Sequence, residues 1–123
     1  DPRCIGKLDA GGPDQGRAYY TALEDMIKEA HRILRDKRYF TLYVSDSWRR
    51  ERPDDVGGTA GGLFMPIGFE LYAIMRKYFL PVDIITVVRH NKNLRKVEFH
   101  QKAEERNFFL RGFNYLFVMR KQK

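Results

Sequence analysis

Cysteine is almost missing from this sequence, which contains Cys4 and no other. A single cysteine cannot form a disulfide within the chain, so the composition suits a reducing compartment, and we expect Cys4 to be an ordinary thiol. No apolar run reaches the roughly 18 residues that a membrane-spanning helix needs, and no signal peptide is visible. We therefore expect a cytoplasmic protein that does not enter a membrane.

Motifs that mark several classes of enzyme are missing as well. The three histidines, His31, His90 and His100, lack the spacing of metal ligands, so we expect no metal site. The chain has no Gly-x-Ser-x-Gly turn, no phosphate-loop lysine and no dinucleotide-binding fingerprint. Asp9 and Asp14 flank glycines, where aspartates that form turns are several times commoner than catalytic acids. These absences exclude the usual hydrolase, nucleotidase and dehydrogenase signatures.

Positive charge, in contrast, is plentiful. The sequence has 23 lysines and arginines against 16 aspartates and glutamates, which gives a formal charge of +7. Such an excess favours a polyanionic partner, because neutralising phosphate groups is the commonest use of clustered lysine and arginine. Since 43% of the residues are hydrophobic, the 123-residue chain is expected to fold as one domain spanning residues 1–123.

Hydrophobic patterning predicts two helices and three main strands. Apolar residues recur at helical spacing over residues 17–34 and again over 66–79, which indicates two amphipathic helices. Runs of aromatic and β-branched residues, typical of buried strands, occupy 39–44, 82–88 and 113–119.

The connections between these elements indicate the fold class. Residues 49–62 are expected to form a polar, glycine-rich loop, and residues 89–107 a long basic connection. Strands joined through a helix should run parallel with a right-handed crossover, whereas the last strand follows without a helix and can return antiparallel. We therefore predict an α/β fold with an antiparallel last strand.

Polar side chains follow the first two strands at the point where each strand ends. Ligands of open α/β sheets bind outside the carboxyl ends of the strands. Ser45, Asp46 and Trp48 would there supply a hydrogen-bonding pair and a stacking ring to a pocket. The candidates for phosphate contact, which follow the same two strands, are Arg49, Arg50, Arg52, Arg89, His90, Lys92, Arg95 and Lys96. A solvated sheet edge and a solvated loop explain the same pattern equally well, so both interpretations stay open.

Three stretches of the second half carry a resemblance to a known family. Residues 66–71, 83–92 and 113–121 resemble the closing half of the S-adenosylmethionine-dependent DNA methylases that act on adenine N6 or cytosine N4. The last strand of that family typically reads H-E-Y-I-L-V-F-R-K, and residues 114–121 are similar to it, with Phe113 in place of the histidine. The resemblance covers nearly all of residues 17–121. It implies a partial Rossmann-like methyltransferase sheet with two helices and three main strands, the last of them antiparallel.

Two motifs of that family are not found in the sequence. Its members bind the cofactor with a Phe-x-Gly-x-Gly loop and hold the target amine with an Asp/Asn/Ser-Pro-Pro-Tyr/Phe tetrapeptide. Asp1 and Pro2 match the first two letters of the tetrapeptide, but Arg3 and Cys4 replace the second proline and the aromatic ring. We therefore assign no catalytic role to Asp1. The chain is similar to the carboxyl-terminal half of a methylase, either a fragment or one piece of a split enzyme that is inactive by itself.

The resemblance implies that the complete enzyme methylates the exocyclic amine of adenine or cytosine in DNA, with S-adenosylmethionine as its cofactor. Ser45, Asp46 and Trp48 would then line the rim of the target-base pocket, and the basic residues would contact DNA. Two alternatives remain open: a non-catalytic basic α/β module that binds nucleic acid or scaffolds a partner, and an RNA base methyltransferase.

The resemblance also predicts an open sheet edge. In the family's sheet, the strand equivalent to residues 39–44 lies between the last strand and the strand that bears the tetrapeptide. If the latter strand is missing, one edge of residues 39–44 has no neighbour, and an exposed edge strand invites pairing with another chain. We expect association through this edge, either with a second copy or with a cofactor-binding half.

Overall fold

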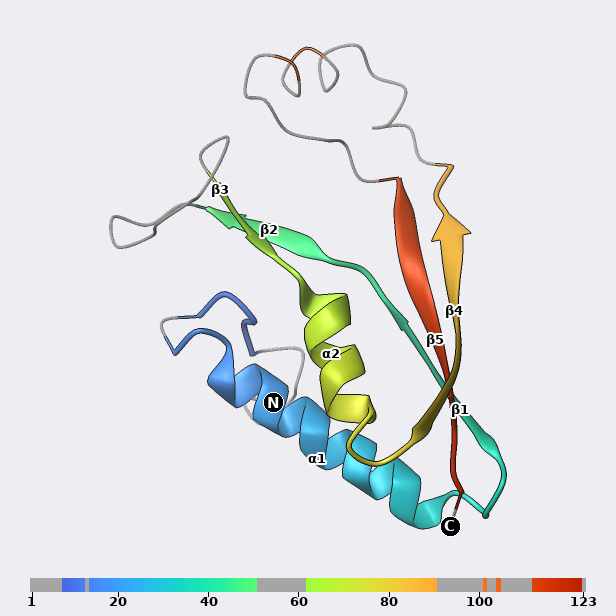
Figure 1. Ribbon diagram of the computed structural model, residues 1–123. Coiled ribbons are helices and arrows are strands. Elements are labelled where there is room, and N and C mark those ends of the chain that lie inside the picture. The colour runs from blue at the N-terminus through green and yellow to red at the C-terminus, as the bar shows by residue number, and fades with distance from the viewer. Residues whose placement is uncertain are drawn as a thin grey trace.

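The computed structural model describes residues 8–12, 14–50, 62–90, 101, 104 and 112–122, and the backbone of this part forms two helices and five strands (Figure 1). In chain order these are α1 (Arg17–Ile33), β1 (Tyr39–Val44), β2 (Ser47–Arg50), β3 (Gly62–Met65), α2 (Ile67–Met75), β4 (Leu80–Val88) and β5 (Phe113–Arg120). No helix in the described part of the chain is both long enough and apolar enough to span a membrane.

The turn before α1 is stabilised by Asp14. The carboxylate of Asp14 accepts hydrogen bonds from the backbone N–H groups of Gly16, at 3.0 Å, and Ala18, at 2.9 Å. These bonds lower the pKa of Asp14 below its usual value, and the bond from Ala18 has the largest effect. Asp9 acts similarly, because its Oδ1 accepts a bond from Gly11 N at 2.8 Å. Both aspartates therefore form turns, as the neighbouring glycines indicated.

Three strands form the main sheet in the order β1-β5-β4, and β5 is antiparallel to both of its neighbours. Strands β1 and β4 consequently run parallel to each other with β5 between them. This arrangement confirms the predicted α/β fold with two helices, three main strands and an antiparallel last strand. Residues 39–44 form β1 as predicted, and β5 ends one residue later than predicted.

The helices cover one face of this sheet. Buried side chains of β5 alternate along the strand, with Tyr115, Phe117 and Met119 meeting Ile27 of α1 and Met75 of α2. Full burial of such a side chain contributes about 1.5–3 kcal/mol. The amphipathic pattern of the first predicted helix therefore pointed to its true packing face.

The structure differs from the sequence-based prediction around residues 47–66. Residues 47–50 pair antiparallel with residues 62–65, so part of the predicted glycine-rich loop is a two-stranded ribbon, β2–β3. Each strand is only four residues long, and its partner is distant in sequence. Strands this short carry too few residues for a reliable alternation pattern.

Helix α2 is shorter than predicted, since it ends at Met75 instead of continuing to residue 79. The backbone N–H groups of Lys77 and Tyr78 bond to carbonyls only three residues back, which tightens the chain into a turn. Strand β4 then begins at Leu80, two residues earlier than predicted. The apolar residues of this turn mimic a helical pattern because they pack on the core.

Strands β1 and β4 are the two edges of the main sheet. In β4, both faces are accessible, with side chains between 44% and 65% exposed at Leu80, Val82, Ile84, Ile85 and Val88. In β1, the free edge lies on the side away from β5, and within the described residues no strand pairs with it. The predicted open edge is thus present in this part of the chain.

Candidate functional site

The carboxyl ends of β1 and β4 lie at the same end of the sheet, on either side of the start of β5. Val44 pairs with Tyr115, and Val88 pairs with Phe113. Beyond β4, the backbone N–H of Arg89 donates to the carbonyl of Gly112 at 2.8 Å. The structure therefore brings together the two polar strand ends that the sequence indicated, at the edge where ligands of α/β sheets bind.

Asp46 sits at this edge in a buried position. Its side chain is 6% exposed, and its Oδ1 accepts a hydrogen bond from the backbone N–H of Gly68 at 2.7 Å. Gly68 is the second residue of α2, so the carboxylate satisfies one of the free N–H groups of the helix N-terminus. A negative charge there also interacts favourably with the helix dipole. The structure thus gives Asp46 a role in joining β1 to α2, in addition to its predicted place at a pocket rim.

The N-terminus of α2 lies unusually close to β5. A methyl group at Gly68 would come within 2.7 Å of Cδ2 of Tyr115 and 3.1 Å of Oδ1 of Asp46. The Tyr115 ring is itself packed against three aromatic rings, those of Phe69, Phe113 and Phe117. A glycine at position 68 is therefore what allows the capping bond to form.

Tyr20 of α1 belongs to the same cluster. Burial is the main cause that raises the pKa of its hydroxyl to about 12, and the carboxylates of Glu70 and Asp46 add to it. Tyr20 consequently stays protonated at alkaline pH values where an ordinary tyrosine ionises. Sequence reasoning missed this residue, because its place in the apolar stripe of α1 gave no sign of neighbouring carboxylates.

A second buried polar group lies on β5. Asn114 is 7% exposed, and its Nδ2 donates a hydrogen bond to the hydroxyl of Tyr43 on β1. Its Oδ1 is buried without a hydrogen-bond partner among the described residues. Sequence reasoning missed Asn114 as well, although it follows the Phe113 position at which the resemblance departs from the family's strand.

The remaining predicted site residues are distributed differently. Ser45 and His90 are exposed beyond the ends of β1 and β4. The backbone of Trp48, Arg49 and Arg50 belongs to β2, and Figure 1 shows the β2–β3 ribbon running away from the end of the main sheet. The other candidates for phosphate contact lie outside the described residues; they are Arg52, Lys92, Arg95 and Lys96. Among the basic candidates that the structure describes, Arg89 lies at the junction of the three strands, bonded to Gly112 and Phe113.

We expect Asp46→Ala to lower the free energy of unfolding by about 1 kcal/mol, because it removes a helix cap from α2. Asp46→Asn keeps an oxygen acceptor, so its free energy of unfolding should fall by less. Urea denaturation of the two variants measures the difference. Equal losses for both would show that the negative charge, and not the acceptor oxygen, stabilises α2.

Tyrosine titration tests the cluster around Tyr20. A pKa raised from 10.0 to about 12 means that the folded state holds this proton more tightly than the unfolded state. The associated stability is complete below pH 10 and is lost as the pH rises towards 12. The pKa values of Tyr19 and Tyr78 are raised as well, so absorbance at alkaline pH should show several late-ionising phenols, and Tyr20→Phe should remove the latest phase. A phase that persists in the variant would assign it to another tyrosine.

Comparison with known proteins finds a match at the level of the fold. No family model matches the sequence, and no curated protein matches it. Two crystal structures of TTHA0409 from Thermus thermophilus, a protein assigned as a DNA modification methylase, do match. The selenomethionine derivative aligns with a TM-score of 0.62 at 17% identity, over 89% of this chain and 39% of that protein. The complex with S-adenosyl-L-methionine aligns with a TM-score of 0.62 at 18% identity, over 86% of this chain and 38% of that protein.

These matches agree with the resemblance seen in the sequence, in which the last strand is the most similar stretch. This chain spans less than two fifths of the length of the aligned protein. At 17–18% identity the likeness establishes the arrangement of helices and strands. The chain therefore has the α/β fold of part of a DNA modification methylase.

Proposed function

We propose that this chain is part of an S-adenosylmethionine-dependent DNA methyltransferase that acts on the exocyclic amine of adenine or cytosine. The observation that carries the proposal is the structural match to a DNA modification methylase across 89% of the chain. The complex of that protein with S-adenosyl-L-methionine and the +7 charge of this chain add support.

In this activity, the chain itself would form part of the rim of the target-base pocket and bind the DNA backbone. A methylase of this kind turns the target base out of the duplex, and the cofactor supplies the methyl group. Ser45 lies at the end of β1, where the rim of the base pocket is proposed, and the basic residues after β1 and β4 would contact phosphates. Such contacts are independent of DNA sequence and sensitive to salt.

The described residues do not fit the cofactor itself. Sheets that bind nucleotides commonly hold ribose hydroxyls with a carboxylate near a strand end. Asp46 is the buried carboxylate among the described residues, and it caps α2 through Gly68. Because the sequence also lacks the Phe-x-Gly-x-Gly loop of the family it resembles, we expect calorimetric titration of the isolated chain with S-adenosylmethionine to show no binding. Binding of S-adenosylmethionine at micromolar concentration would contradict this expectation.

Salt-dependent DNA binding tests the proposed interface. Changing Arg95 and Lys96 to Ala should weaken binding to every duplex and reduce the slope of log K against log salt by about 0.9 for each lost phosphate contact. Fluorescence anisotropy across a salt series measures both quantities. The matched control is the pair Arg17→Gln and Lys28→Gln, which removes two exposed cations from α1. An unchanged slope in the Arg95/Lys96 variant would exclude these residues from the interface.

The same measurement separates DNA from RNA. The protein should bind a DNA duplex clearly more tightly than an RNA duplex of the same sequence. Equal or tighter binding of RNA would favour an RNA base methyltransferase or a general nucleic-acid module.

We also propose that the free edge of β1 pairs with the same strand of a second copy when the chain is isolated. The edge exposes unpaired backbone N–H and C=O groups, which another strand can satisfy. Thr41 is exposed in the middle of β1, and a lysine there would oppose pairing by charge repulsion. Sedimentation should show a concentration-dependent dimer that Thr41→Lys abolishes. A strictly monomeric protein at high concentration would overturn the proposal.

A further inference from the structure

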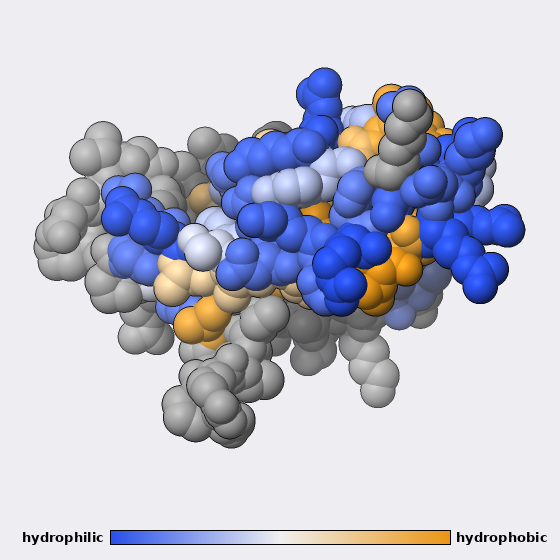
Figure 2. All heavy atoms as spheres, turned by 90° about the horizontal axis from the view of Figure 1, so that it is seen from below, coloured by the Kyte–Doolittle hydropathy of each residue, from blue (hydrophilic) through white to orange (hydrophobic). Residues whose placement is uncertain are grey.

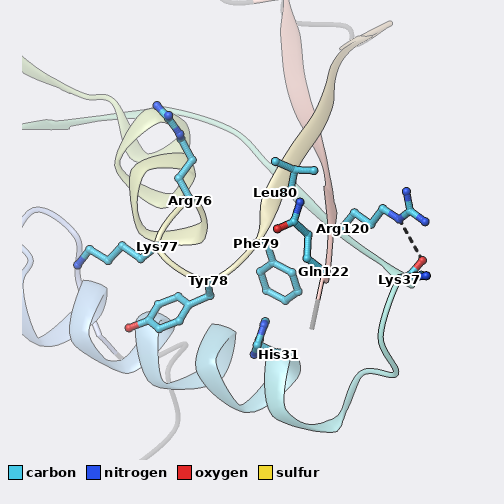
Figure 3. Close-up of a pocket in the computed structure, with 9 residues that line it drawn as sticks. All are labelled: His31, Lys37, Arg76, Lys77, Tyr78, Phe79, Leu80, Arg120 and Gln122. Atoms are coloured by element: carbon cyan, nitrogen blue, oxygen red, sulfur yellow. Dashed lines mark hydrogen bonds between the residues drawn. The ribbon is translucent and has the colours of Figure 1, made fainter.

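A hollow of about 740 Å³ opens at the end of the molecule opposite the strand ends described above (Figure 3). It lies where α1, the turn after α2, the start of β4 and the end of β5 come together. Its lining residues are His31, Lys37, Arg76, Lys77, Tyr78, Phe79, Leu80, Arg120 and Gln122. From Phe113 to Arg120, strand β5 extends about 23 Å, so the hollow is well separated from the proposed DNA interface.

Positive charge dominates the walls of the hollow. Four of its lining residues are lysines or arginines, and none is an aspartate or a glutamate. Among the described residues, only Lys77 of these four pairs with a carboxylate, since its Nζ lies 3.2 Å from Oε1 of Glu24. The other three, Lys37, Arg76 and Arg120, form no ion pair among the described residues. The guanidinium groups of Arg76 and Arg120 lie over the rings of Tyr72 and Tyr39, at 6.0 and 5.6 Å from the ring centroids. In a concave site such charges focus a positive potential.

The base of the hollow is rigid and partly aromatic. The ring of Phe79 is buried, stacks on Phe40 with centroids 5.1 Å apart, and meets His31 edge-on at 5.1 Å. On one wall, Nε of Arg120 donates to the carbonyl of Lys37 at 3.2 Å, a bond drawn in Figure 3. The backbone of Lys37 is also bonded to Lys121. Hydrogen bonds therefore hold the backbone of Lys37 and the guanidinium of Arg120 on this wall of the hollow.

Figure 2 shows the lower face of the molecule, where hydrophilic side chains predominate and small apolar areas lie between them. A surface of this kind favours an ionic ligand over an apolar one. Arginine and lysine together suit phosphate, because the guanidinium forms paired hydrogen bonds to its oxygens and the ammonium adds a point charge.

We propose that this hollow binds phosphate groups, as a second anion site distinct from the DNA interface at the other end of the sheet. Figure 3 shows Arg76 on the wall beside α2 and Lys37 with Arg120 on the wall beside β5, so a ligand that contacts both walls needs at least two phosphate groups. Either a free polyphosphate or consecutive phosphates of a nucleic-acid backbone supply this chemistry. The proposal does not depend on methyltransferase activity.

Calorimetric titration with inorganic pyrophosphate tests the site. The double variant Arg76→Gln and Lys37→Asn should weaken binding at least tenfold. Lys37 has a φ of 65°, a left-handed conformation that asparagine tolerates well, so the change removes charge without straining the turn. The double variant Arg17→Gln and Lys28→Gln removes two exposed cations from α1 outside the hollow and should change affinity less than twofold. No saturable binding, or equal weakening in both double variants, would overturn the proposal.

A salt series with duplex DNA distinguishes the two sources of phosphate. If the hollow takes a nucleic-acid backbone, the Arg76/Lys37 variant should also reduce the salt slope for DNA, by about 0.9 for each contact. If it takes a free polyphosphate, that slope should match the slope of the unmodified protein, while pyrophosphate binding is lost. This experiment and the Arg95/Lys96 experiment change different residues, so either proposal can fail alone.

Discussion

Replacing Lys121 with methionine should lower the free energy of unfolding by about 3 kcal/mol, since hydrogen bonds to a charged group contribute about 1.5–3 kcal/mol each. Lys121 follows β5, and its side chain is almost fully buried. Its Nζ donates to the carbonyls of His31, at 2.6 Å, and Leu34, at 2.7 Å, which close the last turn of α1. Methionine keeps the apolar stem but leaves both carbonyls without this donor.

Two control variants show whether this loss comes from the capping bonds. Lys121→Arg keeps a cation that can reach the carbonyls and should lose clearly less stability than methionine. Lys28→Met removes a lysine from the exposed face of α1 and should change stability by less than about 0.5 kcal/mol. Urea denaturation measures all three variants. A Lys121→Met protein as stable as the Lys28→Met protein would show that the ammonium contributes nothing to the end of α1.

Gly68→Ala should destabilise the protein by about 1–3 kcal/mol, the usual cost of overfilling a packed site. Alanine normally stabilises a helix by about 0.5–1 kcal/mol relative to glycine, so local helix propensity predicts the opposite sign. The added methyl group would lie 2.7 Å from Cδ2 of Tyr115, and that ring cannot move freely because it is buried and stacked on Phe117. The expected readout is a lower midpoint of urea denaturation.

A double-mutant cycle identifies the cause of this effect. Tyr115→Leu removes the ring that the methyl group would meet. Adding Gly68→Ala to that variant should therefore cost less than adding it to the unmodified protein, with a coupling of about 1 kcal/mol or more. If the losses in free energy of unfolding are additive, the clash with Tyr115 does not cause the effect of Gly68→Ala, and strain against Asp46 does.

These variants also help to interpret functional tests at the strand ends. Asp46, Gly68 and Tyr115 together hold α2 against the sheet beside the proposed base pocket. A loss of DNA binding in Asp46→Ala could therefore come from movement of α2. Binding measured in Gly68→Ala, which also disturbs the packing of α2 but retains the Asp46 carboxylate, separates the two effects.

Some features of this protein were accessible from sequence because they depend on neighbouring residues. The apolar period of α1 and the β-branched run of β4 identified a helix and a strand. The turns at Asp9 and Asp14 follow from the hydrogen-bonding habits of aspartate beside glycine. The similarity of residues 114–121 to the last strand of the methylases pointed to the fold that the structure matches.

Other features could not be obtained in that way, because they depend on residues that meet only in the folded chain. Lys121 is one of three basic residues among the last four of the sequence, and nothing in that pattern shows that it is buried against the end of α1. Asp46 was predicted to lie at the rim of a pocket, and only the structure shows that it also caps a helix that begins 21 residues later. The ribbon of β2 and β3 was hidden, since neither four-residue strand has a pattern without its partner.

The sequence by itself thus determined the order and type of the main elements, the basic character of the chain and its likeness to the amino-methylating enzymes. Secondary-structure propensity and hydrophobic periodicity are enough to predict these features, because both depend on residues that are close in sequence. Only the tertiary structure decided that β5 lies between β1 and β4, that Asp46 joins β1 to α2, and that a cationic hollow forms at the opposite end. Those outcomes depend on which distant side chains pack together, and no local pattern encodes that pairing.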